Sequence, residues 1–311
     1  MLSEPAGVLW IVAAAILFGS QFVLNKYCPD MPASAYNVSM AVGILAGSAA
    51  SVLVLGWSPI APGMAVLAFV GGAIWVVGNY LFIVAVARAG IARSYVAVNF
   101  SAVLSFVGGV VFLDELPDLD TPRLVLVVGA VSLVMAGSYL VTTTAPKSGP
   151  AQVRGGSRAK RGLVAAFAST VFFAIYNVLT AFVMNKAGTP ASVTFVAVAP
   201  GIVCGAVLLA LFAPGRALRS WKAAPARRHL LAVLQGLIWA AAMVCILFGW
   251  MGVGIALGTA IQVGIQTLVS SLWGILLFGE LAGLDNRRAA YARFAGGAVL
   301  TVCGIAAITS A

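Results

Sequence analysis

The chain has 311 residues, of which 62% are hydrophobic and only 8% are charged, and its mean hydropathy is +1.08. A soluble globular chain carries about 25% charged residues, and a chain of this size cannot hide so much apolar surface in one water-soluble core. The composition therefore argues against a soluble enzyme, a nucleic-acid-binding protein and a disordered scaffold. The net charge of +10 does not indicate nucleic-acid binding, because the basic residues occupy short gaps between apolar runs. We predict a polytopic membrane protein.

Uncharged stretches long enough to cross a bilayer recur along the whole chain. About 20 apolar helical residues span the hydrocarbon core, and a charge at mid-span is costly. One helix each is predicted within 5–25, 94–113, 124–146, 162–185, 187–215 and 294–311. The longer stretches 31–87 and 229–279 are each predicted to hold two helices, broken near 56–63 and 250–254. The sequence thus predicts an all-α protein with ten transmembrane helices.

Lys and Arg are distributed unevenly between the predicted loops. The loops after odd-numbered helices hold 16 of the 18 basic residues, and only Arg123 and Lys186 lie on the other side. By the positive-inside rule, the odd-numbered loops face the cytoplasm. We therefore expect a multi-pass protein of the cell (inner) membrane with both termini on the non-cytoplasmic side.

The two halves of the chain repeat each other in order. Short motifs recur with offsets that drift only from 158 to 168: Pro32-Ala33-Ser34 as Pro190-Ala191-Ser192, Gly72–Trp75 as Gly236–Trp239, and Glu115-Leu116 as Glu280-Leu281. We predict a first five-helix repeat over 1–142, a basic Pro/Gly/Ser linker over 143–160 and a second repeat over 161–311. Because five is odd, the second copy enters the membrane from the opposite side. Such inverted-topology repeats can exchange inward-open and outward-open shapes around a midplane site.

Four short segments, together with this arrangement, carry a family resemblance. The fourth helix of each half ends in Glu, within FLDEL at 112–116 and LFGEL at 277–281, and the 5+5 pattern with these motifs resembles the drug/metabolite transporter superfamily. The segments FGSQFV at 18–23, continued to Lys26, and GGAIWVVGN at 71–79 are similar to helices one and three of its glucose/ribose porter branch. The resemblance implies uptake of sugars or related metabolites through a cavity among helices one, three, four, six, eight and nine.

Strongly polar and aromatic side chains gather on those same helices. A polar group in hydrocarbon is costly unless it is bonded or faces a wet cavity, and several of these residues share a helical face at i, i+4. Interhelical hydrogen bonds that only hold the bundle together are the alternative explanation, but the partition of the residues by helix favours a site. The candidate substrate-binding residues are Gln21, Asn25, Trp75, Asn79, Tyr95, Asn99, Tyr176, Asn177, Gln235, Trp239, Gln262 and Gln266.

The chemistry of these side chains suits a neutral polyol. Amides both donate and accept hydrogen bonds, and Trp stacks on the apolar faces of sugars. We predict a secondary transporter that moves a small neutral polar metabolite, a sugar or sugar-like compound, by alternating access. An exporter of amino acids or drug-like compounds on the same fold is the alternative, and it would need a buried countercharge. An enzyme is not expected, because the sequence has no catalytic constellation, metal-ligand cluster or cofactor motif.

Charged residues at three predicted helix ends are candidates for a charge or gating role. Lys26 either snorkels to the interface or contacts an anionic substrate group. Glu115 and Glu280 end their helices, where a lid-like or structural role is favoured. The expected partners are the small-molecule substrate and the lipid bilayer. Gly-xxx-Gly spacings at Gly43 and Gly201 serve internal packing as readily as a homodimer, which the sequence does not indicate.

Overall fold

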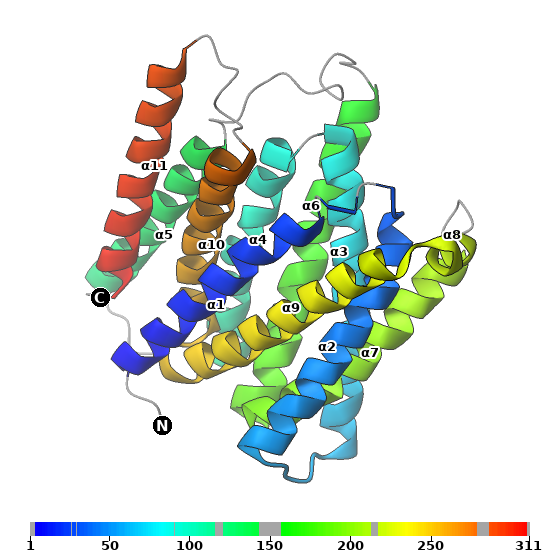
Figure 1. Cartoon of the computed structure of the whole chain (residues 1–311). Helices are drawn as coiled ribbons and strands as arrows, with labels where there is room; N and C mark the ends of the chain where they lie inside the picture. The colour runs from blue at the N-terminus through cyan, green and yellow to red at the C-terminus, as the bar shows by residue number, and fades with distance from the viewer. Residues whose placement is uncertain are drawn as a thin grey trace.

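The computed structural model describes residues 4–25, 27–28, 30–89, 91–115, 121–142, 157–212, 217–278 and 286–309. Within these ranges the chain forms eleven α-helices and a π-helical turn, η1, with no strand (Figure 1). The elements are α1 (Glu4–Asn25), α2 (Ala33–Leu55), α3 (Pro62–Ala89), α4 (Ile91–Leu113), α5 (Thr121–Thr142), α6 (Ser157–Ala181), η1 (Phe182–Lys186), α7 (Ala191–Phe212), α8 (Ala217–Ala223), α9 (Ala226–Val253), α10 (Ile255–Phe278) and α11 (Arg287–Ile308).

Nine helices of the described ranges are long and apolar enough to cross a membrane, and a shorter apolar helix covers Ala97–Leu113 of α4. The prediction of an all-helical membrane protein is confirmed at this level. Each of the two longest uncharged stretches holds two helices, as predicted. The first stretch breaks between Leu55 and Pro62, and in the second only Gly254 separates α9 from α10. Gly254 has a φ of 83°, a conformation that disfavours residues with a Cβ.

Two local features differ from the sequence prediction. The short helix α8 was not predicted, because counting uncharged stretches finds only spans, and α8 contains Arg219 and Lys222. Its Trp221 packs against the hydrophobic core. Helix α6 begins at Ser157, inside the segment predicted as linker, and 143–156 of that segment lie outside the described residues.

The closest helix crossings are made at glycines that face each other. A Cβ added to Gly43 of α2 would collide with a backbone carbonyl of α9 and lie 3.1 Å from the Cα of Gly236. At a second crossing, a Cβ at Gly72 of α3 or at Gly201 of α7 would collide with the backbone of the other helix. Small residues at such crossings allow backbones to touch, which is how helices associate without a hydrophobic driving force. The contacts also place α1 along α9 and α6 along α3.

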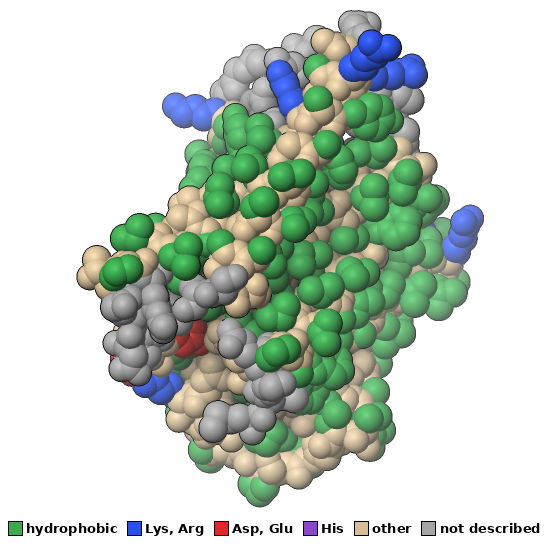
Figure 2. All heavy atoms as spheres, turned by 90° about the vertical axis from the view of Figure 1, so that its left-hand side faces the viewer, with side chains coloured by type: hydrophobic (Ala, Val, Ile, Leu, Met, Phe, Trp, Pro, Cys, Tyr) green, Lys and Arg blue, Asp and Glu red, His purple; other side chains and the backbone are tan. Residues whose placement is uncertain are grey.

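The outer surface is apolar, as expected for lipid contact. Helices α5 and α11 pack on each other at one edge of the bundle (Figure 1). Large hydrophobic side chains such as Val125, Val128, Val299 and Val302 are exposed on this pair. Hydrophobic side chains cover most of the face drawn in Figure 2, and Lys and Arg lie toward its margins. An apolar surface of this extent would be a liability in water but suits a bilayer.

We expect Gly43→Leu to lower the free energy of unfolding by about 2 kcal/mol or more, because the new side chain meets backbone that cannot move aside without separating α2 from α9. Gly129→Leu is the matched control, since a Cβ at Gly129 of α5 meets no atom within 4 Å. Thermal unfolding of both variants in detergent measures the difference. Equal Tm values for the two variants would contradict the proposed role of the crossing.

Candidate functional site

A cavity lies between the helices and is lined mainly by α1, α3, α4, α6, α9 and α10. Its volume is about 120 Å³. This is several times the ~10–15 Å³ that one water molecule requires, so a small metabolite is an appropriate occupant. None of the described lining residues is charged. A cavity of this kind favours a neutral ligand.

Nine of the predicted substrate-binding residues line this cavity. They are Gln21, Trp75, Asn79, Asn99, Tyr176, Asn177, Trp239, Gln262 and Gln266. They come from the six helices that the resemblance implied. Because the short helix α8 shifts the labels by one, α9 and α10 are the eighth and ninth predicted spans. Residues more than 200 positions apart in the sequence thus meet around one space.

The other predicted residues lie elsewhere or outside the described part of the chain. Gln235 accepts a hydrogen bond from the Tyr36 hydroxyl, so it joins α9 to α2, and it does not line the cavity. Asn25 is half-buried at the end of α1 and does not line the cavity. Lys26, Glu280 and the side chain of Tyr95 lie outside the described residues.

Aromatic rings form one wall of the cavity. Trp75 of α3 and Trp239 of α9 pack against each other with ring centroids 4.7 Å apart and an interplanar angle of 55°. Phe18 and Phe173 extend this wall, with centroids 6.2 Å from Trp239 and 6.4 Å from Trp75. Both tryptophans are buried, so their rotamers are fixed by packing. Such rigid, apolar ring faces are suited to stacking on the C–H face of a ligand.

The asparagines that line the cavity are held in place by hydrogen bonds to neighbouring helices. Asn79 donates to Asn37 at 2.8 Å, Asn99 to Thr267 at 3.2 Å, and Asn177 to Ser105 at 3.1 Å. On α10 itself, Gln262 donates to Gln266 one turn later. An amide has two donor hydrogens and an oxygen with two lone pairs. These bonds therefore orient the side chains and do not use their full hydrogen-bonding capacity.

Among the lining residues that the sequence analysis missed, Trp250 and Thr259 carry buried polar atoms without a partner in the described part of the chain. Trp250 lies within the segment predicted as a break between helices, and Thr259 was passed over because a lone Thr in a membrane helix usually bonds to the i−4 carbonyl. A usable signal was present for Thr259. It precedes Gln262 by three residues and Gln266 by seven, so the three share one face of α10.

Glu115 lies at one end of the bundle and does not line the cavity. Its two carboxylate oxygens accept hydrogen bonds from the backbone N–H groups of Ile255 and Ala256 at 2.9 and 2.8 Å, which caps the first turn of α10. A negative group at a helix N-terminus is favourable because unpaired N–H groups and the helix dipole converge there. Burial raises the pKa of Glu115 above 4.5, although the two backbone N–H groups act against this shift. Glu115 thereby joins the end of α4 to the start of α10.

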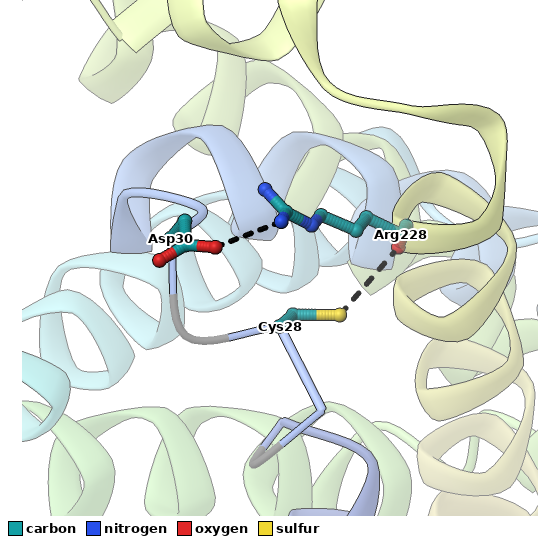
Figure 3. A network of polar contacts seen from close by, with 3 residues as sticks. All are labelled: Cys28, Asp30 and Arg228. Carbon is teal, nitrogen blue, oxygen red and sulfur yellow. Dashed lines mark hydrogen bonds and ion pairs between the residues drawn. The ribbon is translucent and has the colours of Figure 1, made fainter.

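A second set of polar contacts lies at the opposite end of the bundle from Glu115, where α1 ends and α9 begins. Arg228 of α9 forms an ion pair with Asp30 at 2.8 Å, and the Cys28 thiol lies 4.0 Å from the Arg228 carbonyl oxygen (Figure 3). These contacts tie the connection between α1 and α2 to the start of α9. Both Arg228 and Asp30 are partly exposed, so the ion pair contributes at most about 1 kcal/mol.

The comparisons with known proteins agree with this architecture. No curated protein matches the chain. A crystal structure of a protein with 18% sequence identity aligns with a TM-score of 0.69, covering 95% of this chain and 98% of that chain, which supports the fold alone. A family model described as "Sugar transport protein" matches residues 3–143 and 120–310, which together are nearly the whole chain. The chain therefore belongs to the sugar transport protein family of membrane transporters.

Proposed function

We propose that this chain is a secondary transporter that carries a small neutral polar metabolite, a sugar or sugar-like compound, through its central cavity by alternating access. The observation that carries the proposal is the uncharged cavity with an aromatic wall and oriented amides, in a chain of the sugar transport protein family. The wall offers apolar stacking surface, and the amides offer donors and acceptors. A polyol is the class of molecule that needs both.

The proposal includes the inverted five-helix repeat of the drug/metabolite transporter superfamily, with ten spans and halves at 1–142 and 161–311. Its support is a two-fold pattern in the packing. Trp75 and Trp239, which are equivalent by the sequence repeat, pack against each other. The α2–α9 crossing at Gly43 has its counterpart in the α7–α3 crossing at Gly201, and α1 lies on α9 as α6 lies on α3. Both tryptophans would then lie beside the pseudo-two-fold axis.

Alternating access requires that one end of the cavity be closed while the other opens. In our proposal the Glu115 contact between α4 and α10 is the closing contact at one end. Glu280 has the equivalent position in the sequence repeat. We propose that it caps the start of α4 when the cavity is closed at its other end. By the distribution of Lys and Arg, the Glu115 end and both termini face away from the cytoplasm.

The alternative of amino-acid or drug export has no support in the cavity. Zwitterionic and cationic ligands lose their hydration on entering a low-dielectric site and need an opposite charge to compensate. The described lining residues include none. We therefore retain the neutral metabolite as the proposed substrate.

Uptake into proteoliposomes tests the proposed substrate class. A panel of labelled hexoses, pentoses, 6-deoxyhexoses, amino acids and cationic dyes should give uptake of a sugar only. We expect Trp239→Ala to reduce that uptake at least about tenfold, because it removes the stacking surface, and Trp239→Phe to retain part of it. Trp57→Ala is the control, since Trp57 is 60% exposed in a connection outside the cavity. Uptake of dyes or amino acids alone would contradict the proposal.

Maleimide labelling of a cysteine at Leu113, which is buried at the end of α4 in this arrangement, tests the closing role of Glu115. The four native cysteines are first replaced. Glu115→Ala removes both caps on α10, worth about 1 kcal/mol, so labelling should increase severalfold. Asp30→Asn, at the opposite end, should leave it unchanged.

The same labelling assay has a defined pH dependence. Burial raises the pKa of Glu115 in the closed arrangement above its value in water, so that arrangement binds the proton more tightly. Closure at this end should therefore become more favourable, and labelling slower, as the pH falls through the raised pKa toward 4.5. Glu115→Gln cannot ionise and should abolish this dependence. Faster labelling at low pH would contradict the assignment.

A further inference from the structure

Three residues that line the cavity carry polar atoms without a hydrogen-bond partner among the described residues. They are Gln21 Oε1, Trp250 Nε1 and Thr259 Oγ1, and their side chains are at most 3% exposed. A buried polar group left unpaired is unfavourable, so such atoms at a cavity wall indicate where a ligand makes its hydrogen bonds. The inference that follows rests on the proposed function and concerns how the substrate is recognised.

Trp250 is held against the first turns of α10. A Cβ added to Gly258 would lie 2.8 Å from Cδ1 and 3.4 Å from Nε1 of Trp250, so the indole edge that bears the N–H fits there only because residue 258 is glycine. The indole N–H is a donor with no acceptor function. Thr259 is the next residue of α10 after Gly258, and both it and Trp250 line the cavity.

Thr259 differs from most buried threonines of the membrane helices, and the other described one without a partner, Thr180, does not line the cavity. Thr267 on the same helix donates to the carbonyl of Val263, and Thr301 donates to the carbonyl of Gly297, at 2.8 and 2.9 Å. This i−4 bond is the usual arrangement for Thr in an apolar helix. The Thr259 hydroxyl has neither this bond nor another partner in the described part of the chain, although the residue is only 1% exposed. Its hydrogen-bonding capacity is unused within the protein.

Gln21 lies at a different level of the cavity. Gly19, two residues earlier on α1, packs against the carbonyl oxygen of Gln266, which is seven residues beyond Thr259 on α10. At 1.5 Å per residue, Gln266 lies about 10 Å along α10 from Thr259, so Gln21 and Thr259 contact different ends of the cavity.

We propose that Trp250 and Thr259 form a hydroxyl-binding subsite at the α10 N-terminal end of the cavity, and that Gln21 binds the opposite edge of the same neutral polyhydroxy ligand. The Trp250 N–H donates to a substrate hydroxyl oxygen, and the Thr259 hydroxyl donates to or accepts from the same edge of the substrate. The carboxamide oxygen of Gln21 accepts from a hydroxyl on the far edge. These bonds satisfy the three unpartnered atoms only when the substrate is bound.

Competition for uptake by singly deoxygenated analogues of the transported sugar tests the subsite. In the wild type, one analogue should bind about tenfold more weakly than the parent, because it lacks the hydroxyl that these residues bind. In Thr259→Val and in Trp250→Phe, the inhibition constant of the parent sugar should rise about tenfold. The inhibition constant of that analogue should change little. The ratio between the two inhibition constants should therefore fall toward one. Such a protein–ligand double-mutant cycle isolates the pairwise interaction.

Two further variants separate recognition from folding. Thr259→Ser keeps the hydroxyl and should retain the wild-type ratio. Thr301→Val makes the same substitution as Thr259→Val at a fully buried position outside the cavity lining, and should also keep that ratio. Sugar uptake with the wild-type ratio in both Thr259→Val and Trp250→Phe would overturn the subsite and leave the proposed function intact. Failure of the wild type to take up any sugar would instead contradict the proposed function, and the hydroxyl assignment with it.

Discussion

The absence of water from the hydrocarbon core is the physical constraint on which this structure depends. A polar group that leaves water without gaining a hydrogen bond is strongly disfavoured, so polar side chains within membrane helices are paired or face a wet space. In the described chain, Gln235 is paired with Tyr36 across two helices and lies outside the cavity lining, whereas Gln21 and Thr259 line the cavity and have unpartnered atoms. Position at the cavity together with hydrogen-bonding capacity that the protein leaves unused marks the residues that we assign to substrate recognition.

The same constraint explains how the cavity can lie inside a tightly packed bundle. Helices in lipid gain little from burying apolar side chains against each other, so they associate where small residues let their backbones touch. Crossings at Gly43 and at Gly201 hold α2 to α9 and α7 to α3. Around these contacts the larger side chains of Trp75 and Trp239 meet and form one cavity wall. Close crossings fixed by glycine and a cavity walled by rigid rings are compatible with helices that tilt as units.

Much of the fold could be predicted from the sequence, because charged residues are excluded from spans and therefore mark helix ends. The breaks at Gly254 and between α2 and α3 were predicted on this basis. Helix α8 was not predicted, since a short basic helix leaves no uncharged stretch.

The candidate site could be predicted in part. Nine candidate site residues meet at the cavity because strongly polar residue types stand out against an apolar background. Gln235 could not be separated from them, because its bond to Tyr36 depends on packing between distant helices. Thr259 and Trp250 are assigned to the site because their polar atoms have no partner within the described protein. Only the three-dimensional arrangement reveals which hydrogen bonds are left unmade.

The central claim is that two repeated halves open opposite ends of one cavity in turn. Pulsed electron resonance distances in proteoliposomes test it most directly, using one spin-label pair at Phe112 and Met251 and a second at Arg88 and Leu277. These four residues are exposed, and the pairs lie near opposite ends of the α4–α10 contact. Our account predicts that adding substrate shifts the two distances in opposite directions, one shortening as the other lengthens. Distances that change in the same direction, or that stay fixed during transport, would contradict it.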